Sequence, residues 1–249
     1  MQKLIYFLVN KFFMNKVGFQ LLNYIDKGKK DKTIFDVGCY RGDFTKNIIN
    51  YESKEKIKSN IFLFDPSPKV KNYLSSILEN KNVKYFNLAI DNTNSQKKFT
   101  FNQFWEPASS LHSTHKDDKW YNISRKTFMQ LVQPFSKIKD YTEILVQTKT
   151  LDNFCLDNNI KYIDILKIDV NGNALNVFKG AEKLLLEDKI GLIYTEIAAK
   201  KKEYTNKVEE IENFLKKYNF EQKKIFKMPI LSFLSGLQGS DHLFLHKKI

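Results

Sequence analysis

The sequence predicts an α/β fold: a mostly parallel sheet with helices on both faces, ending in an antiparallel hairpin. Three observations lead to this prediction. Short apolar segments of strand length alternate with segments whose apolar residues recur at helical spacing. A glycine turn follows the first of these strands and leads into a helix. The last two strand segments, residues 220–226 and 242–247, have no helix between them, so we expect them to pair antiparallel.

The first half of the chain carries the alternation most clearly. Because helical crossovers join strands that run in the same direction, we expect a parallel sheet with right-handed connections here. The expected strands are residues 33–38, 61–65 and 83–88, and the expected helices are residues 44–50 and 69–79.

The middle of the chain departs from this alternation, which then resumes. The middle is expected to contain an edge strand at 97–101, a polar and aromatic loop at 102–120, a helix at 121–133 and a strand at 143–149. The second half is expected to add strands at 163–168 and 190–197 and helices at 174–185 and 208–218.

The chain is expected to form one domain over residues 33–249, preceded by an N-terminal helical extension over residues 1–32. No Gly-, Pro- or Ser-rich stretch divides it, and 249 residues suit a single α/β domain. The apolar run at residues 4–9 is too short to span a bilayer. We expect the extension to pack on the domain, with peripheral contact to a membrane surface as the alternative.

The net charge of +13 comes almost entirely from lysine, since Arg41 and Arg125 are the only arginines. Arginine is the usual residue for bidentate phosphate and base contacts, so the charge favours a solvated Lys-rich surface over attraction to an acidic glycan, lipid headgroup or nucleotide. Cys39 and Cys155 lack C-x-x-C spacing. With two cysteines and no disulfide framework, we expect a cytoplasmic protein.

The loop at residues 36–45 is the first candidate binding site. Gly38 and Gly42 follow the first strand and precede the first helix, where the backbone can approach a ligand closely. Their spacing differs from G-x-G-x-x-G, which disfavours phosphate binding. The carboxylate of Asp36 would suit a ligand that carries an ammonium group, and a plain tight turn is the alternative.

The second candidate is Asp65, at the end of the second strand. In doubly wound folds, an acidic side chain at this point accepts hydrogen bonds from a ribose diol. The alternative is a helix N-cap ahead of Pro66, because aspartate is a good cap. Position on the second strand favours the ribose.

With these motifs in place, the sequence resembles the FkbM-type S-adenosylmethionine-dependent methyltransferases over residues 33–197. The resemblance implies a Rossmann-like, seven-stranded methyltransferase sheet with six parallel strands and one antiparallel strand. The matching motifs, in order, are DVGCYRGDFT (36–45), FDPSP (64–68), LAID (88–91), SSL (109–111), TLDNF (150–154), LKIDVNGNALNVFKGA (166–181) and TEI (195–197).

The resemblance also implies where S-adenosylmethionine, the cofactor, would bind. Asp36, Gly38 and Gly42, with Cys39 between them, would line its methionine end. Asp65, where the family more often has Glu, would hold the ribose, with Pro66 beside it. Ala89 and Ile90 would contact the adenine through their backbone and apolar surface.

One departure from the family pattern lies near the expected reaction centre. Where the family usually has Glu-Gly-x-Glu after the Lys-x-Asp strand, this chain has Asn171, Gly172, Asn173 and Ala174. Two carboxylates are therefore missing, so the protein must manage without them or act on a different acceptor.

We expect Asp169 to be the catalytic base or a metal ligand, since it ends the fourth strand of the sheet, where ligands gather. Its alternative role is to cap the next helix. Lys167 would pair with a carboxylate or orient the acceptor, and Glu196 is placed similarly. His112 and His115 in the middle loop are the alternative bases. The ligand type of Asp169 and Glu196 would also suit a divalent metal.

The resemblance implies methyl transfer to a hydroxyl oxygen of a carbohydrate or glycan-like acceptor, with a small-molecule acceptor left open. A nucleic-acid methyltransferase would suit the charge, but the chain lacks an Asn/Asp-Pro-Pro-Tyr/Phe motif. The glycine spacing and the antiparallel ending disfavour a nicotinamide oxidoreductase. A catalytically silent cofactor-binding module is the third alternative, which the missing carboxylates support.

Overall fold

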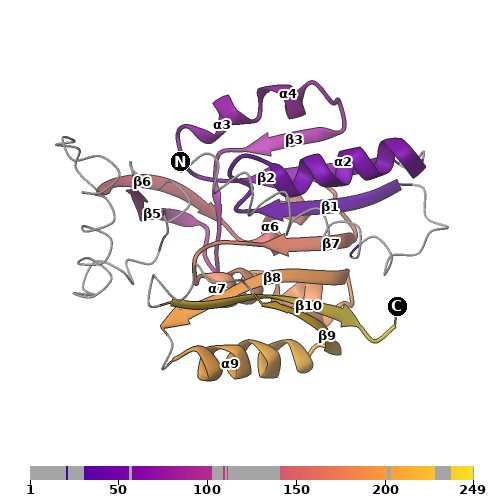
Figure 1. The fold of residues 1–249 in the computed structure, drawn as a ribbon, viewed down its shortest axis with the longest axis vertical. Helices are drawn as coiled ribbons and strands as arrows, with labels where there is room; N and C mark the ends of the chain where they lie inside the picture. The colour runs from indigo at the N-terminus through magenta and orange to yellow at the C-terminus, as the bar shows by residue number, and fades with distance from the viewer. Residues whose placement is uncertain are drawn as a thin grey trace.

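The structure is a computed structural model that describes residues 21, 31–55, 58–102, 109, 111, 141–200, 203–227 and 237–248. Within these residues, the chain forms one seven-stranded sheet and one three-stranded sheet (Figure 1). The expected helix at 121–133, the histidines His112 and His115, and nearly all of the expected N-terminal extension lie outside the described residues.

The seven-stranded sheet has the order β3-β2-β1-β7-β8-β10-β9. The strand β10 runs antiparallel to both of its neighbours, whereas the pairs from β3 to β8 are parallel. This arrangement confirms the predicted fold class, including the antiparallel C-terminal pair. The strands are β1 (Asp31–Val37), β2 (Lys58–Phe64), β3 (Val83–Phe86), β7 (Ile163–Ile168), β8 (Ile190–Lys200), β9 (Phe220–Lys227) and β10 (Leu237–His246).

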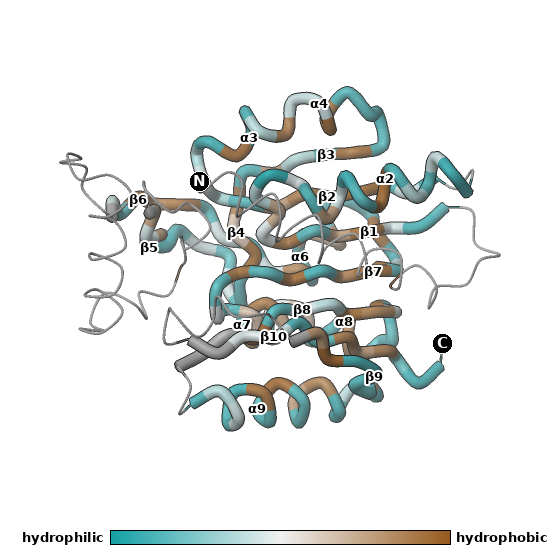
Figure 2. The backbone as a smooth tube through the Cα atoms, in the orientation of Figure 1, coloured by the Kyte–Doolittle hydropathy of each residue, from teal (hydrophilic) through white to brown (hydrophobic). Residues whose placement is uncertain are grey.

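Helices cover both faces of this sheet and bury one apolar core on each. One core takes residues from α2, α3 and α4, together with the fully buried Leu21, and the other takes residues from α6 to α9. The helices α2 and α9 alternate between apolar and polar residues along their length (Figure 2), as amphipathic helices do. The helices are α2 (Asp43–Glu55), α3 (Val70–Tyr73), α4 (Ser75–Leu78), α6 (Leu151–Asp157), α7 (Ala174–Lys179), α8 (Glu182–Leu186) and α9 (Tyr204–Lys216).

Two of the expected helices are each divided in the structure. The helix expected at 174–185 is α7 followed by α8, and Gly180 lies at the break. A Cβ atom on Gly180 would lie 2.1 Å from the carbonyl oxygen of Asp91, so the chain approaches there too closely for a side chain. The helix expected at 69–79 is α3 followed by α4, joined at Leu74, whose N–H bonds to the Lys71 carbonyl three residues back.

The small sheet has the order β4-β6-β5 and is formed by β4 (Ala89–Ile90), β5 (Ser95–Asn102) and β6 (Tyr141–Lys149). The expected edge strand at 97–101 lies within β5, at one edge of this sheet. In Figure 1, β5 and β6 extend away from the end of the large sheet at which β1 and β7 finish. The small sheet therefore lies beside the edge where the candidate site residues gather.

No helix within the described residues has both the length and the apolar character needed to cross a membrane.

Candidate active site

The loop after β1 packs tightly against the ends of its neighbours. Gly38 and Gly42 have φ of +74° and +70°, and Tyr40 between them has φ of +44°, so three residues adopt the left-handed conformation. A Cβ atom on Gly38 would lie 1.8 Å from the Asp169 carbonyl oxygen, and one on Gly42 would lie 2.3 Å from Cδ1 of Ile77. Position 38 therefore requires glycine because a backbone atom blocks any side chain there, whereas the left-handed φ favours glycine at position 42, where only the ends of flexible side chains lie close. This packing holds the loop directly against the residue that follows β7.

Asp36, just before this loop, is fully buried, and each of its carboxylate oxygens has a partner within the chain. Its Oδ1 lies 2.9 Å from Nζ of Lys167, and its Oδ2 accepts a 2.8 Å hydrogen bond from Oγ1 of Thr45. The carboxylate thus meets the ammonium group of Lys167 rather than that of a ligand. Asp36 can act on a bound ligand only through the loop that it fixes.

Three oxygen atoms surround the ammonium group of Lys167, whose side chain is 5% exposed. Nζ lies 2.9 Å from Asp36 Oδ1 and 3.8 Å from Asp169 Oδ2, and it donates to the Gly38 carbonyl at 2.7 Å. Burial lowers the pKa of Lys167, but the charges of Asp36 and Asp169 outweigh this effect and raise the pKa above its ordinary value. Of the two roles expected for Lys167, these contacts support pairing with carboxylates.

Asp65 follows β2 and links the loops after β1 and β2. Its Oδ2 accepts from the backbone N–H of Tyr40 at 3.1 Å, and its Oδ1 accepts from that of Ser67 at 2.9 Å. Burial raises the pKa of this carboxyl to about 6, while the two backbone hydrogen bonds lower it. Asp65 does not cap the next helix, because α3 begins at Val70 with Lys69 as its N-cap. The alternative role of Asp65 as a helix N-cap is therefore not observed.

The other residues expected to contact the cofactor have little exposed side-chain surface. Cys39 is 5% exposed, and burial followed by the charge of nearby carboxylates raises the pKa of its thiol, which stays neutral. The side chain of Ala89 packs in the core of the small sheet, and that of Ile90 packs in the large core. Contact between these two residues and a ligand would therefore come from their main chain. Pro66, which lies between Asp65 and Ser67 in the loop after β2, is half-buried.

Polar side chains form two rows across one face of the sheet at this edge. Asp36 is in register with Lys167, and Lys167 is in register with Tyr194. Residues two apart on a strand share a face, so the residues two positions further along form a second row beside the first. In that row, Glu196 is in register with Asp241. The rows are Asp36, Lys167 and Tyr194 in one, and Asp169, Glu196 and Asp241 in the other.

Glu196 and Asp169 form a pair of neighbouring carboxyl groups that interact through a hydrogen bond. Burial raises the pKa of Glu196 well above its ordinary value, and the charge of Asp169 and a hydrogen bond to it raise the pKa further. Burial and the neighbouring charge therefore favour the protonated form of Glu196, which would donate to Asp169, and the side chain of Asp169 is 44% exposed. Among the described residues, no group of three or more His, Cys, Asp or Glu side chains is arranged to hold a metal ion.

Asp169 does not cap the helix that follows it. The helix α7 begins at Ala174, and its N-cap is Asn173. The backbone N–H of Asp169 instead donates to the Val37 carbonyl at 2.9 Å, which extends the pairing of β7 with β1. The exposed carboxylate is thus left facing the edge of the sheet, next to the loop after β1.

The asparagines that replace the usual Glu-Gly-x-Glu pattern bind neighbouring segments of the chain. Asn171, with φ of +47°, donates from Nδ2 to the Ser109 carbonyl at 3.0 Å. Asn173 donates from Nδ2 to the buried carboxylate of Asp91 at 3.3 Å. A carboxylate at position 171 could not donate the first of these hydrogen bonds. The amides therefore fasten the segment after β7 to the segments around the small sheet.

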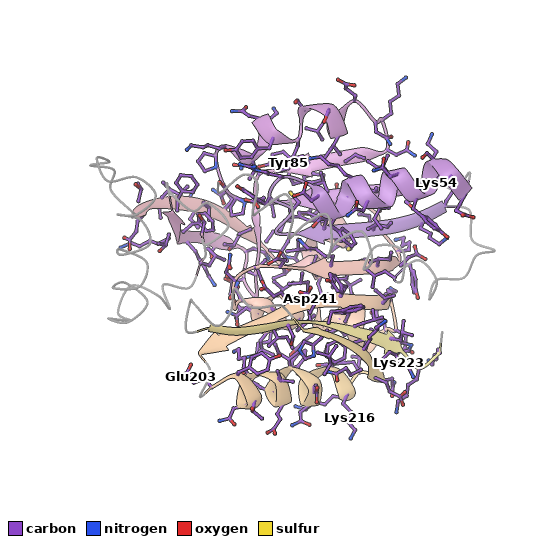
Figure 3. The ribbon with its side chains drawn as sticks, in the orientation of Figure 1. Lys54, Tyr85, Glu203, Lys216, Lys223 and Asp241 are labelled. Carbon is purple, nitrogen blue, oxygen red and sulfur yellow. The ribbon has the colours of Figure 1, made fainter. Side chains whose placement is uncertain are left out.

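Sequence reasoning missed Tyr194 and Asp241, whose side chains meet at this edge. Oη of Tyr194 donates to Oδ2 of Asp241 at 2.6 Å, and Asp241 of β10 is labelled in Figure 3. The available signal was the acidic residue at 241 in a strand whose alternate positions, Leu243 and Leu245, are buried and apolar. Its position opposite Glu196 follows from the antiparallel register, which no local pattern reveals.

Replacing Asp241 with asparagine is expected to stabilise the protein at pH 8 and to leave it nearly unchanged at pH 4. Burial and then the charge of Asp169 raise the pKa of Asp241 to about 7, although Tyr194 and Lys167 act to lower it. A carboxyl group whose pKa is raised in the folded protein contributes stability that is fully present below about pH 3.9, the pKa of aspartate in the unfolded chain. This contribution is lost as the pH rises through the pKa of the group in the folded protein. Asparagine avoids this loss, so the gain at pH 8 has an upper limit of about 4 kcal/mol.

Urea unfolding of the wild type and Asp241→Asn at both pH values measures this effect. The amide oxygen introduced by the substitution can still accept the hydrogen bond from Tyr194, so the comparison isolates the charge. A stability difference that is the same at pH 4 and pH 8 would contradict the assignment.

Comparison with known proteins places this geometry in a family. Residues 36–221 match the model of the methyltransferase FkbM domain. A curated relative, the 2-O-methyltransferase NoeI of Sinorhizobium fredii (strain NBRC 101917 / NGR234), is 25% identical over 191 residues, which cover 73% of this chain and 68% of the relative.

One solved structure shares the fold. The methyltransferase FkbM from Methylobacillus flagellatus KT aligns with a TM-score of 0.50 and 10% identity, over 87% of this chain and 44% of that one. This chain therefore spans less than half of that neighbour. SMU.1697c from Streptococcus mutans, in complex with SAH, aligns with a TM-score of 0.45 and 10% identity, over 93% of this chain and 97% of that one. Since the family model covers most of the chain, the protein belongs to the FkbM family of S-adenosylmethionine-dependent methyltransferases.

Proposed function

We propose that this methyltransferase transfers the methyl group of S-adenosylmethionine to a hydroxyl oxygen of a carbohydrate or glycan-like acceptor, with Asp169 as the base. One observation carries the proposal: Asp169 presents an exposed carboxylate at the carboxyl edge of the sheet, next to the loop after β1 and to Glu196, whose pKa burial raises. The curated relative named as a 2-O-methyltransferase supports an oxygen acceptor.

The residues at the edge of the sheet fit the cofactor. S-adenosylmethionine supplies the methyl group and a sulfonium leaving group. Asp65 would hold the ribose, because its carboxylate is fixed by two backbone N–H groups and each oxygen has a further lone pair to accept from a diol. The backbone of residues 38–42 would line the methionine end, and the main chain of β4 would lie at the adenine.

Methyl transfer requires the protein to align the acceptor hydroxyl with the methyl group and to remove one proton from that hydroxyl. The acceptor hydroxyl would donate to Asp169, which takes the proton as the new C–O bond forms and the C–S bond breaks. Lys167 holds Asp169 on one side, and Glu196 donates to it on the other, so the carboxylate keeps one orientation. The products are the methyl ether, the demethylated cofactor and a proton, which Asp169 then releases to solvent.

Methyl-labelled S-adenosylmethionine, incubated with the protein and a panel of polysaccharides, lipid-linked sugars and RNA, tests the proposal. Label in a base-stable ether on a sugar hydroxyl is the expected result. Transfer to RNA alone would favour a nucleic-acid methyltransferase. Cofactor binding without transfer to any acceptor would favour the catalytically silent module.

The affinity for S-adenosylhomocysteine is expected to fall as the pH drops below about 6. Burial raises the pKa of Asp65 to about 6, and the ionised form is the one that accepts from both ribose hydroxyls. The dissociation constant should therefore rise by up to about tenfold for each pH unit below this value. Calorimetry from pH 5 to pH 8 measures it. Asp65→Asn should bind weakly with little pH dependence, and an equal slope in both proteins would contradict the role of Asp65.

A further inference from the structure

The turn that follows the proposed base carries an amide that reaches a distant segment of the chain. Asn171 and Gly172, just after Asp169, adopt the left-handed conformation, with φ of +47° and +86°. Asparagine tolerates this conformation better than most residues that have a side chain. Nδ2 of Asn171 donates at 3.0 Å to the carbonyl of Ser109, which lies 62 positions earlier in the chain. The hydrogen bond therefore holds the main chain at Ser109 beside the turn after Asp169.

The segment that Asn171 holds is also anchored in the small sheet. Leu111, which closely follows Ser109 in the chain, packs against the apolar core of that sheet. In Figure 1, β5 and β6 extend away from the edge of the large sheet at which β7 ends. Residues 109 and 111 therefore connect the core of the small sheet with the turn after the base. The buried residues of that core are Ala89 of β4, Phe99 and Phe101 of β5, and Val146 of β6.

A second amide in the same turn binds the small sheet directly. Nδ2 of Asn173 donates at 3.3 Å to Oδ1 of Asp91, the residue after β4. The buried Asp91 carboxylate also accepts from Nζ of Lys97 in β5 at 2.5 Å. A carboxylate at position 171 or 173 could donate neither of the two amide hydrogen bonds. The asparagines therefore suit this chain, because both of their partners are acceptors.

This arrangement limits the directions from which an acceptor can approach Asp169. The loop after β1 packs against the Asp169 carbonyl, and we place the methionine end of the cofactor along that loop. The exposed Asp169 carboxylate has to meet the acceptor hydroxyl. The turn after Asp169 comes next along the chain, and the main chain at Ser109 lies against that turn. We therefore expect the acceptor to enter between the cofactor and the segment at Ser109.

We propose that Asn171 is a positioning residue for the acceptor: its hydrogen bond to the Ser109 carbonyl fixes one side of the site at which the carbohydrate binds. The inference rests on the proposed function, because it takes Asp169 as the base and a carbohydrate hydroxyl as the methyl acceptor. In this role Asn171 acts through the main chain at Ser109 and does not contact the transferred methyl group. Its loss should therefore weaken acceptor binding and spare both the chemical step and the affinity for the cofactor.

Two substitutions test this inference. Asn171→Gly removes the donor and keeps the left-handed turn, whereas Asn171→Asp removes the donor and keeps the shape of the side chain. The acceptor is the polysaccharide or lipid-linked sugar to which the wild type transfers label. Both variants should raise KM for this acceptor about 3- to 10-fold, the range expected for one hydrogen bond. In Asn171→Gly, which adds no charge near Asp169, kcat and S-adenosylhomocysteine affinity should stay within about twofold.

The matched control is Asn159→Asp, the same change at another left-handed asparagine, with φ of +54°, before the amino end of β7. It should leave KM and kcat within about twofold of the wild type. Three results would overturn the inference: acceptor KM within about twofold in both Asn171 variants, a fall in kcat or in S-adenosylhomocysteine affinity of Asn171→Gly as large as its rise in KM, or variants that melt several degrees lower or fail to fold. A wild type that labels no carbohydrate would instead overturn the proposed function.

Discussion

Lys167→Met is expected to destabilise the fold by about 3–5 kcal/mol, because it leaves the Asp36 charge buried without its counter-ion. Asp36 is fully buried, and Lys167 provides the ammonium group 2.9 Å from its Oδ1. The variant also removes the donor to the Gly38 carbonyl, so the loop after β1 loses one of its anchors. A loss of this size is a large share of the stability of an ordinary domain, and urea unfolding at neutral pH measures it.

The double variant Asp36→Asn with Lys167→Met is the matched control. Removing both charges together leaves no unpaired ion in the core, and neutral replacements of a buried ion pair are often tolerated. We expect the double variant to recover most of the lost stability. If Lys167→Met costs less than about 1 kcal/mol, or if the double variant is no better than the single one, then the pairing of these two residues does not stabilise the loop.

The fold could be predicted from the sequence because its buried parallel strands read as apolar runs between helical segments. The breaks in the helices could not be predicted. Gly180 lies at the break between α7 and α8, against the Asp91 carbonyl from a distant part of the chain, a contact that no local pattern reveals. The helix α6 was also missed, although Thr150, which caps it by accepting from the Asn153 N–H, is a local signal for a helix start.

The site was only partly predictable, for a similar reason. Asp169 and Glu196 could be placed at one edge because each stands at or near the end of a parallel strand, and such ends meet. Asp36 was assigned to a ligand because a local motif does not reveal that Lys167, far along the chain, neutralises it. Asp241 required the register of an antiparallel pair. Local patterns therefore located the edge, and long-range pairing decides which of its charges are available to a substrate.

Asp169→Asn is expected to lower turnover by about 100-fold or more while leaving S-adenosylhomocysteine affinity within about threefold, the loss typical of a missing general base. The amide keeps the shape of the side chain but cannot accept the acceptor's proton. Asp169 does not cap α7, and its side chain is 44% exposed, so the melting temperature should change little. Single-turnover rates with a labelled cofactor and the acceptor found in the panel separate the loss of chemistry from a loss of binding.

Glu196→Gln provides the sharpest contrast, because burial and the charge of Asp169 raise the pKa of Glu196 well above its ordinary value and so favour its protonated form. Glutamine reproduces this neutral, hydrogen-bond-donating form. Turnover of Glu196→Gln should stay within about fivefold of the wild type, although Glu196 and Asp169 are neighbouring carboxyl groups. Equal losses in the two variants would mean that the pair acts as a unit. A larger loss in Glu196→Gln would make Glu196 the base, and the proton would then reside on Asp169.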